Sequence, residues 1–211
     1  MHLPNRDRWV TLWRATGAGG DAAGWYERLT SAYAEPHRYY HTQHHIAECL
    51  AEFDRVRRLA RHPTAVEFAL WFHDAVYDPR AADNEEQSAA LAKSCFAEFK
   101  VADALPETVA KLIMATKTHE LNAGDDAELV IDIDLSVLGR DEEGFLQYEQ
   151  QIRREYAWVP ELVFASKRLE ILQRFVAREH LFATKWFRNK YEAQARRNLK
   201  ASNTKLKRLC S

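Results

Sequence analysis

The chain has 211 residues, of which 30 are Lys or Arg and 31 are Asp or Glu, so its formal net charge is -1. This balance argues against a polycation built to bind nucleic acid and against an acidic disordered chain. The 46% of hydrophobic residues can form a core, while 7 glycines and 6 prolines are too few for an all-β fold, which needs a turn about every 8–12 residues. We therefore expect an all-α protein with one domain spanning residues 1–211.

Apolar residues recur at three- and four-residue spacing along most of the chain, which is typical of amphipathic helices. Near the N-terminus, Trp9 and Trp13 lie on one helix face and are expected in the core. Residues 129–135 alternate Ile and Asp and also fit a strand, but a lone strand in a helical chain would have no partner. The predicted helices are a short one around Trp9, then residues 21–34, 39–60, 63–78, 83–99, 106–116, 129–139, 141–156, 161–178 and a basic helical tail over about 185–211.

Features of the sequence also indicate the cellular compartment of the protein. The longest apolar run, residues 68–72, is far shorter than the roughly 20 residues that a membrane span needs. The N-terminus lacks the apolar segment of a secretory signal. The cysteines (Cys49, Cys95 and Cys210) are odd in number and widely spaced, so neither a disulfide framework nor a cysteine metal motif is predicted. A cytoplasmic protein without a membrane partner is expected.

Three histidines lie close together at residues 41–45. On the predicted helix, His41 and His45 are four residues apart and therefore share a face, with His44 at its edge. The spacing is similar to the HExxH helix of zinc proteases, but Thr42 stands where that motif needs its general-base Glu. A protease site is therefore excluded, and an exposed helix surface with three chance histidines is the alternative.

The adjacent pair His73 and Asp74 follows the apolar run 68–72. Part of this helix should be buried, and an ionisable pair is costly to bury unless something neutralises it. One imidazole nitrogen and one carboxylate oxygen could bind a single metal ion. A structural salt bridge is the alternative.

Two carboxylates, Asp132 and Asp134, interrupt another apolar run. Being two residues apart, they cannot point the same way on a helix, so one should face a site while the other caps, pairs or reaches solvent. The alternative is that both are exposed. Together with His45, His73 and Asp74, that aspartate would hold a divalent ion through nitrogen and oxygen ligands. Such a set favours octahedral ions such as Mn²⁺, Fe²⁺, Co²⁺ or Mg²⁺ over sulfur-rich zinc sites.

The order His, His-Asp, Asp on successive helices resembles the HD superfamily of metal-dependent phosphohydrolases. The segment Tyr40 to His45 and the run Asp134 to Ser136 are also similar to motifs of the cyclic nucleotide phosphodiesterases in that wider group. Further motifs resemble a bacterial subfamily of predicted HD phosphohydrolases of about 200 residues, and they lie at residues 38–41, 72–77, 84–89, 116–119, 132–139, 152–156 and 192–199.

The resemblance implies an HD-type helical bundle with a divalent metal ion (Mn, Mg, Co, Fe, Ni or Zn). His45, His73, Asp74 and Asp134 would bind this ion. His41 would protonate the leaving oxygen as a general acid or orient the phosphate, and Asp74 would be catalytic through the metal. The implied reaction is hydrolysis of a phosphomonoester or phosphodiester of a small, nucleotide-like substrate by metal-activated water.

Five further residues are expected to bind substrate or to support the ligands: Glu85, Lys117, His119, Asp132 and Arg153. The cations among them suit phosphate oxygens. His119 is the one evident counterpart of the extra histidines that hold a second metal in the cyclic nucleotide enzymes. For Glu85 the alternative is a structural role in the first turn of its helix, because Asp83 and Glu86 resemble a capping box.

The basic tail carries nine Lys or Arg and a single acid, Glu192. A solvated helix with a frayed end is predicted, in which Glu192 pairs with Arg196 four residues on. A weak polyanion site is the alternative, but nucleic acid is not an expected partner. Two other functions stay open: a di-iron oxygenase on a similar His/Asp scaffold, and a non-enzymatic, metal-containing binding module.

Overall fold

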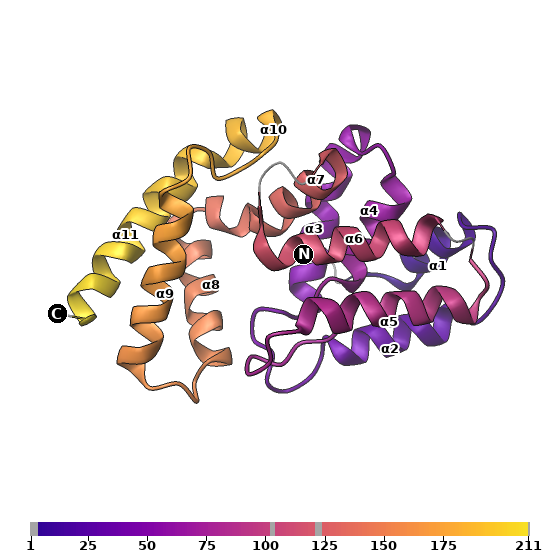
Figure 1. The fold of residues 1–211 in the computed structure, drawn as a ribbon, viewed down its shortest axis with the longest axis horizontal. Helices are drawn as coiled ribbons and strands as arrows, with labels where there is room; N and C mark the ends of the chain where they lie inside the picture. The colour runs from indigo at the N-terminus through magenta and orange to yellow at the C-terminus, as the bar shows by residue number, and fades with distance from the viewer. Residues whose placement is uncertain (1–3, 102–103, 121–123, 211) are drawn as a thin grey trace. The chain divides into compact units, whose positions relative to one another are not determined.

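A computed structural model describes residues 4–101, 104–120 and 124–210 of the chain, and all regular structure within these ranges is helical (Figure 1). The prediction of an all-α fold is therefore confirmed. The chain divides into two compact units, residues 1–133 (the first unit) and 134–211 (the second unit). That they form one HD-type domain stays a prediction. No helix in the described ranges is long and apolar enough to cross a membrane.

The helices of the first unit are α1 (Arg6–Arg14), α2 (Ala22–Ala32), α3 (Gln43–Val56), η1 (Arg57–Leu59), α4 (Pro63–Phe72), α5 (Asn84–Glu98), α6 (Ala104–Thr118) and α7 (Asp125–Asp134, whose last residue belongs to the second unit). Those of the second unit are η2 (Leu135–Gly139), α8 (Glu142–Glu155), α9 (Glu161–Val176), α10 (Lys185–Phe187), the π-turn η3 (Arg188–Glu192) and α11 (Ala193–Cys210).

Helix α4 forms the centre of the first unit. Every residue from Ala65 to Phe72 is buried, as expected for a helix that is apolar on all sides. Helices α1, α3, α5 and α6 pack against it, and α5 and α6 lie side by side in Figure 1. Trp9 and Trp13 insert between these helices, each meeting Phe68 edge to face at 5.6 and 5.7 Å between ring centroids. Both tryptophans are core residues, as predicted.

The second unit is held together by α9 and α11, which pack against each other. The basic tail is helical as predicted, but it is not fully solvated, because α11 buries Ala195, Asn198 and Leu199. The Asn198 amide donates to the carbonyls of Leu138 and Arg140, both at 2.8 Å, and so ties the tail to η2. The predicted pair of Glu192 and Arg196 forms at 2.7 Å.

The capping box predicted for residues 83–86 does not form. The Asp83 side chain makes no cap bond to α5 and instead accepts from the Gln87 amide at 3.1 Å. Glu86 pairs with Lys117 of α6. Glu86 therefore binds a cation on a neighbouring helix instead of the start of its own helix, and the local sequence pattern could not reveal this partner.

Candidate metal centre

The first histidine segment enters α3 through Thr42. This residue has extended backbone (φ -117°, ψ 177°), and its hydroxyl accepts the His44 N–H at 3.3 Å. Thr42 is therefore the N-cap, and α3 begins at Gln43. The prediction that His41 and His45 share a helix was wrong, since His41 precedes the cap. Their rings nevertheless lie 6.1 Å apart, because the chain turns directly into the helix.

The second segment leaves the central helix earlier than predicted. Helix α4 ends at Phe72, and the segment expected to continue to about residue 78 turns away. The Asp74 N–H donates to the Tyr33 hydroxyl at 3.2 Å, while that hydroxyl donates to the Trp71 carbonyl at 3.1 Å. Burial raises the pKa of the Tyr33 phenol well above its ordinary value, so it stays a neutral donor. A tyrosine of α2's C-cap thus ends α4 and fixes the turn that carries Asp74.

Arg38 joins the two segments. This arginine is buried, and its guanidinium donates to the carbonyls of His41 at 3.2 Å, Asp74 at 2.6 Å and Ala75 at 3.1 Å. Its Nε donates to Glu35 at 2.9 Å. Only a guanidinium has enough donors in a fixed plane to hold several carbonyls at once. Arg38 therefore positions both segments.

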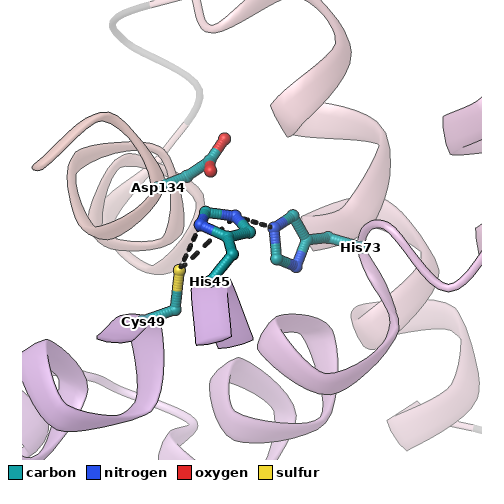
Figure 2. A group of neighbouring side chains, drawn as sticks. All are labelled: His45, Cys49, His73 and Asp134. Atoms are coloured by element: carbon teal, nitrogen blue, oxygen red, sulfur yellow. Dashed lines mark hydrogen bonds between the residues drawn. The ribbon is translucent and has the colours of Figure 1, made fainter. Parts of the chain in front are cut away.

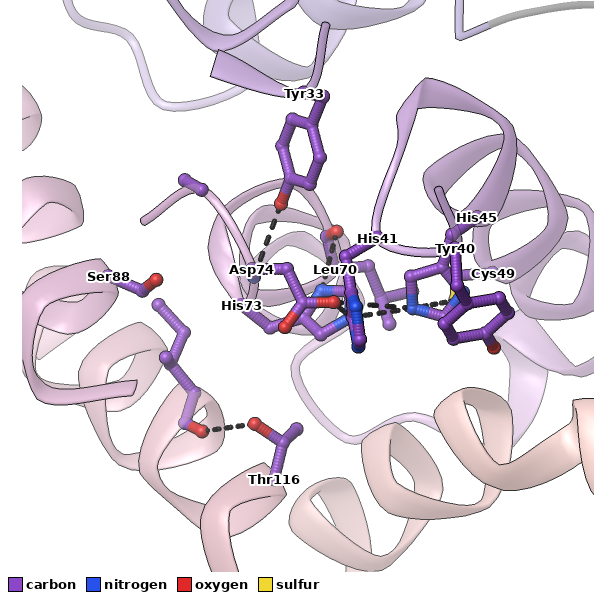
Figure 3. A network of polar contacts seen from close by, with 12 residues as sticks. Tyr33, Tyr40, His41, His45, Cys49, Leu70, His73, Asp74, Ser88 and Thr116 are labelled. Carbon is purple, nitrogen blue, oxygen red and sulfur yellow. Dashed lines mark hydrogen bonds and ion pairs between the residues drawn. The ribbon is translucent and has the colours of Figure 1, made fainter. Parts of the chain in front are cut away.

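Three atoms that could bind a metal ion lie close together between these segments (Figure 3). His45 Nε2 lies 3.1 Å from His73 Nε2 and 3.5 Å from Asp74 Oδ2, and His73 Nε2 lies 3.1 Å from the same oxygen. Both imidazoles are 2% exposed, whereas the Asp74 side chain is 19% exposed. The two imidazole nitrogens and the carboxylate oxygen thus lie close together, and the group is open to solvent only through the Asp74 side chain.

The tautomer of His73 is set by the end of α4. His73 Nδ1 lies 3.1 Å from the Leu70 carbonyl, which can only accept, so Nδ1 carries the hydrogen. In the neutral ring, Nε2 then presents a lone pair to the Asp74 carboxylate. Two acceptors at 3.1 Å repel each other unless a cation lies between them, either a proton on the ring or a metal ion. Metal-binding histidines are commonly oriented by this kind of bond to their other nitrogen.

The charge of Asp74 follows from the same neighbours. Burial alone would raise the pKa of its carboxyl, but the imidazoles of His73, His41 and His45 outweigh burial and hold that pKa well below its usual range. The carboxylate is therefore ionised at neutral pH and available as a ligand.

The separations fit a metal shell. Ligand atoms about 2.1 Å from one ion are about 3.0 Å apart at right angles and about 3.4 Å apart in a tetrahedron. The observed 3.1 to 3.5 Å fall at these values. His45, His73 and Asp74 can therefore bind one divalent ion with little movement.

Two more possible metal ligands, Cys49 and Asp134, lie close to this group. Ligand atoms of His45, Cys49, His73 and Asp134 all lie within 4.8 Å of one another, with Asp134 at the end of α7 (Figure 2). Asp134 was among the predicted ligands, but Cys49 was not, since the cysteines were judged by their spacing from each other. The signal that could have found it is its position four residues after His45, which places both on one face of α3.

His41 stands beside this group rather than in it. Its ring stacks on Tyr77 at 4.1 Å between centroids and meets Tyr40 edge on at 5.0 Å. It is half-buried, and its charge helps to lower the pKa of Asp74. The neighbouring His44 points away, is exposed and pairs with Glu48 at 3.0 Å.

The remaining predicted residues are placed as follows. Lys117 is paired with Glu86 and donates to the Ala82 carbonyl at 2.8 Å, and Glu85 is half-buried in the first turn of α5. Asp132 is fully buried in α7. His119 follows α6 in the left-handed conformation (φ 50°) and is half-buried. Their roles toward substrate stay predictions.

Arg153 belongs to the second unit. Its guanidinium donates to the carbonyls of Tyr156 at 2.5 Å and Val159 at 3.0 Å and lies over the Phe164 ring. These bonds close the turn after α8, which gives Arg153 a structural role. The prediction that it grips phosphate has no support from these contacts.

Comparison of the chain with protein-family models, with curated proteins and with solved structures finds no match. The resemblance to the HD superfamily therefore stays a prediction that rests on the motifs quoted above.

Proposed function

We propose that the protein is a divalent-metal-dependent phosphohydrolase that cleaves a phosphoester of a small, nucleotide-like molecule. The observation that carries the proposal is the convergence of His45 Nε2, His73 Nε2 and Asp74 Oδ2 within 3.5 Å, with the His73 tautomer fixed by Leu70. A metal ion in this group would polarise a phosphoryl oxygen and lower the pKa of a water molecule.

The chain's own residues would divide the work. His45, His73 and Asp74 would hold the ion together with Asp134, which lies close to the two histidines. Arg38 would keep the segments of His41 and Asp74 in register through its carbonyl bonds. His41, stacked on Tyr77, would donate a proton to the leaving oxygen. The partial exposure of Asp74 leaves a route by which substrate could reach the site.

The test is metal analysis of the purified protein followed by hydrolysis assays. The assays would use phosphomonoesters and cyclic and linear nucleotides with Mn²⁺, Mg²⁺, Co²⁺, Ni²⁺ or Zn²⁺ added. We expect about one ion per chain and metal-dependent release of phosphate or nucleotide. His45→Ala should lose both.

A matched control is His44→Ala, which removes the neighbouring, exposed histidine. It should bind metal and turn over like the unchanged protein. Failure of the unchanged protein to bind any of the five ions, or full turnover by His45→Ala, would contradict the proposal.

A further inference from the structure

Cys49 is a buried thiol next to the candidate ligands, and the proposed function does not use it. Its Sγ lies 3.7 Å from His45 Nε2 and 3.8 Å from His45 Nδ1, and it is 2% exposed. The other described cysteines differ. Cys95 is buried near Glu98, where burial and this carboxylate raise the pKa of its thiol, and Cys210 is exposed.

The position of Cys49 is fixed by the same helix that fixes His45. Four residues separate them on α3, so one rigid turn presents a nitrogen and a sulfur to the same point. Sulfur and nitrogen bound to one tetrahedral ion, at about 2.3 and 2.05 Å, are about 3.6 Å apart, against about 3.1 Å at right angles. The observed 3.7 Å to Nε2 is close to the tetrahedral value, but Sγ is almost as near to Nδ1, at 3.8 Å, so the Cys49 side chain must turn toward the Nε2 lone pair to share an ion.

We infer that Cys49 is a thiolate ligand of this metal centre and makes it selective for a thiophilic ion such as Zn²⁺ or Co²⁺ over Mg²⁺. The inference rests on the proposed metal site. Nitrogen and oxygen ligands alone would also suit Mg²⁺, whereas an added thiolate would not. A thiolate is a soft ligand that binds Zn²⁺ and Co²⁺ but has little affinity for Mg²⁺. On binding, the thiol gives its proton to solvent.

Cobalt reports such a bond directly, because a thiolate bound to Co²⁺ gives a charge-transfer band in the near ultraviolet that nitrogen and oxygen ligands do not give. The full chain would be stripped of metal and titrated with Co²⁺, with bound cobalt measured by equilibrium dialysis. We expect about one Co²⁺ per chain and the thiolate band. Zn²⁺ should displace the cobalt, whereas a large excess of Mg²⁺ should not.

The variant is Cys49→Ser, with Cys95→Ser as the matched buried control. Cys49→Ser should still bind cobalt through the remaining ligands, about 10–100-fold more weakly, but without the band. Cys95→Ser should keep it. Cobalt binding without a thiolate band in the unchanged protein, or a band that survives in Cys49→Ser, would overturn the inference while leaving the proposed function standing. Absence of cobalt binding in the unchanged protein would overturn the inference, and it would overturn the proposed function as well only if Mn²⁺, Mg²⁺, Ni²⁺ and Zn²⁺ also fail to bind.

Discussion

Each unit buries charged groups, but the two sets differ in how they are neutralised. In the second unit, Arg168 donates to Glu149 from Nε at 3.1 Å and to the Tyr148 hydroxyl at 2.8 Å, and Ser202 donates to the other Glu149 oxygen at 2.8 Å. Each of these donors faces an acceptor. In the first unit, His73 Nε2 faces the Asp74 carboxylate at 3.1 Å, and both are acceptors when the imidazole is neutral.

This difference separates a structural pair from a candidate site. In a buried pair of opposite charges each group satisfies the other, so no ligand is needed, even where the attraction does not fully repay the desolvation. A neutral imidazole facing a carboxylate needs a cation between them, either a proton on the ring or a metal ion. Burial of charge is therefore weak evidence for function, whereas a local excess of acceptors indicates what a ligand must supply.

The largest effect should come from removing the charge of Asp74. Asp74→Asn keeps the shape of the side chain but leaves no carboxylate to bind a metal. We expect turnover to fall at least about 1000-fold, equivalent to roughly 4 kcal/mol of lost metal assistance. Steady-state hydrolysis with saturating metal measures this. Asp78→Asn, an exposed aspartate in the following loop, is the control, and equal rates for the two variants would contradict the comparison.

Breaking the pair of the second unit should instead cost stability. Arg168→Met leaves the Glu149 carboxylate, whose side chain is 17% exposed, without its main partner. We expect about 3 kcal/mol of destabilisation in urea unfolding. The double variant Arg168→Met, Glu149→Leu should lose less than Arg168→Met alone, because no uncompensated charge stays buried. A double variant that is less stable than the single one would show that Glu149 stabilises the unit through a contact other than Arg168, such as the Ser202 hydroxyl.

Arg38 should show an intermediate effect on both properties. Arg38→Lys keeps the charge but cannot hold the carbonyls of His41, Asp74 and Ala75 together. We expect about 2 kcal/mol of lost stability and a metal affinity about 10–100-fold weaker. Thermal unfolding and cobalt titration measure the two. The control is Arg28→Lys, which changes an arginine that lies over the Trp25 ring. Equally weakened metal binding in Arg28→Lys would contradict the inference that Arg38 positions the ligands.

The sequence predicted the helices well where one helix face meets the core. The spacing of Trp9 and Trp13 and the apolar run before His73 were sufficient, because burial is recorded in the periodicity of apolar residues. It also brought His45, His73, Asp74 and one of Asp132 or Asp134 together as candidates, since the residue types that bind metals are few, and the resemblance to the HD superfamily implied Asp134.

What the sequence did not predict depends on partners distant in the chain. The turn at Asp74 is fixed by Tyr33, 41 residues earlier, and by Arg38, 36 residues earlier. No local pattern encodes such a bond. The start of α3 was different, because a Thr before a helical segment is a readable cap signal. Cys49 was also readable, from its spacing to His45.

The smallest effect should come from the exposed pair of Glu86 and Lys117, which is neither a buried pair nor a set of acceptors. The Lys117 ammonium lowers the pKa of the Glu86 carboxyl, and Glu86 raises the pKa of Lys117. A lowered carboxyl pKa adds stability above the unfolded value of about 4.3 that is lost as the pH falls through the folded value. A raised lysine pKa adds stability below about 10.4 that is lost as the pH rises through the folded value.

The pair therefore stabilises the protein only between these limits, and weakly, because solvent and salt screen it. Glu86→Gln should lower the melting temperature slightly at pH 7 and low salt, and not at all at pH 3 or in 1 M NaCl. Thermal unfolding across this pH range measures the difference from the unchanged protein. A difference that persists at pH 3, or one as large as that of Arg38→Lys, would mean that Glu86 acts through something other than its charge on Lys117.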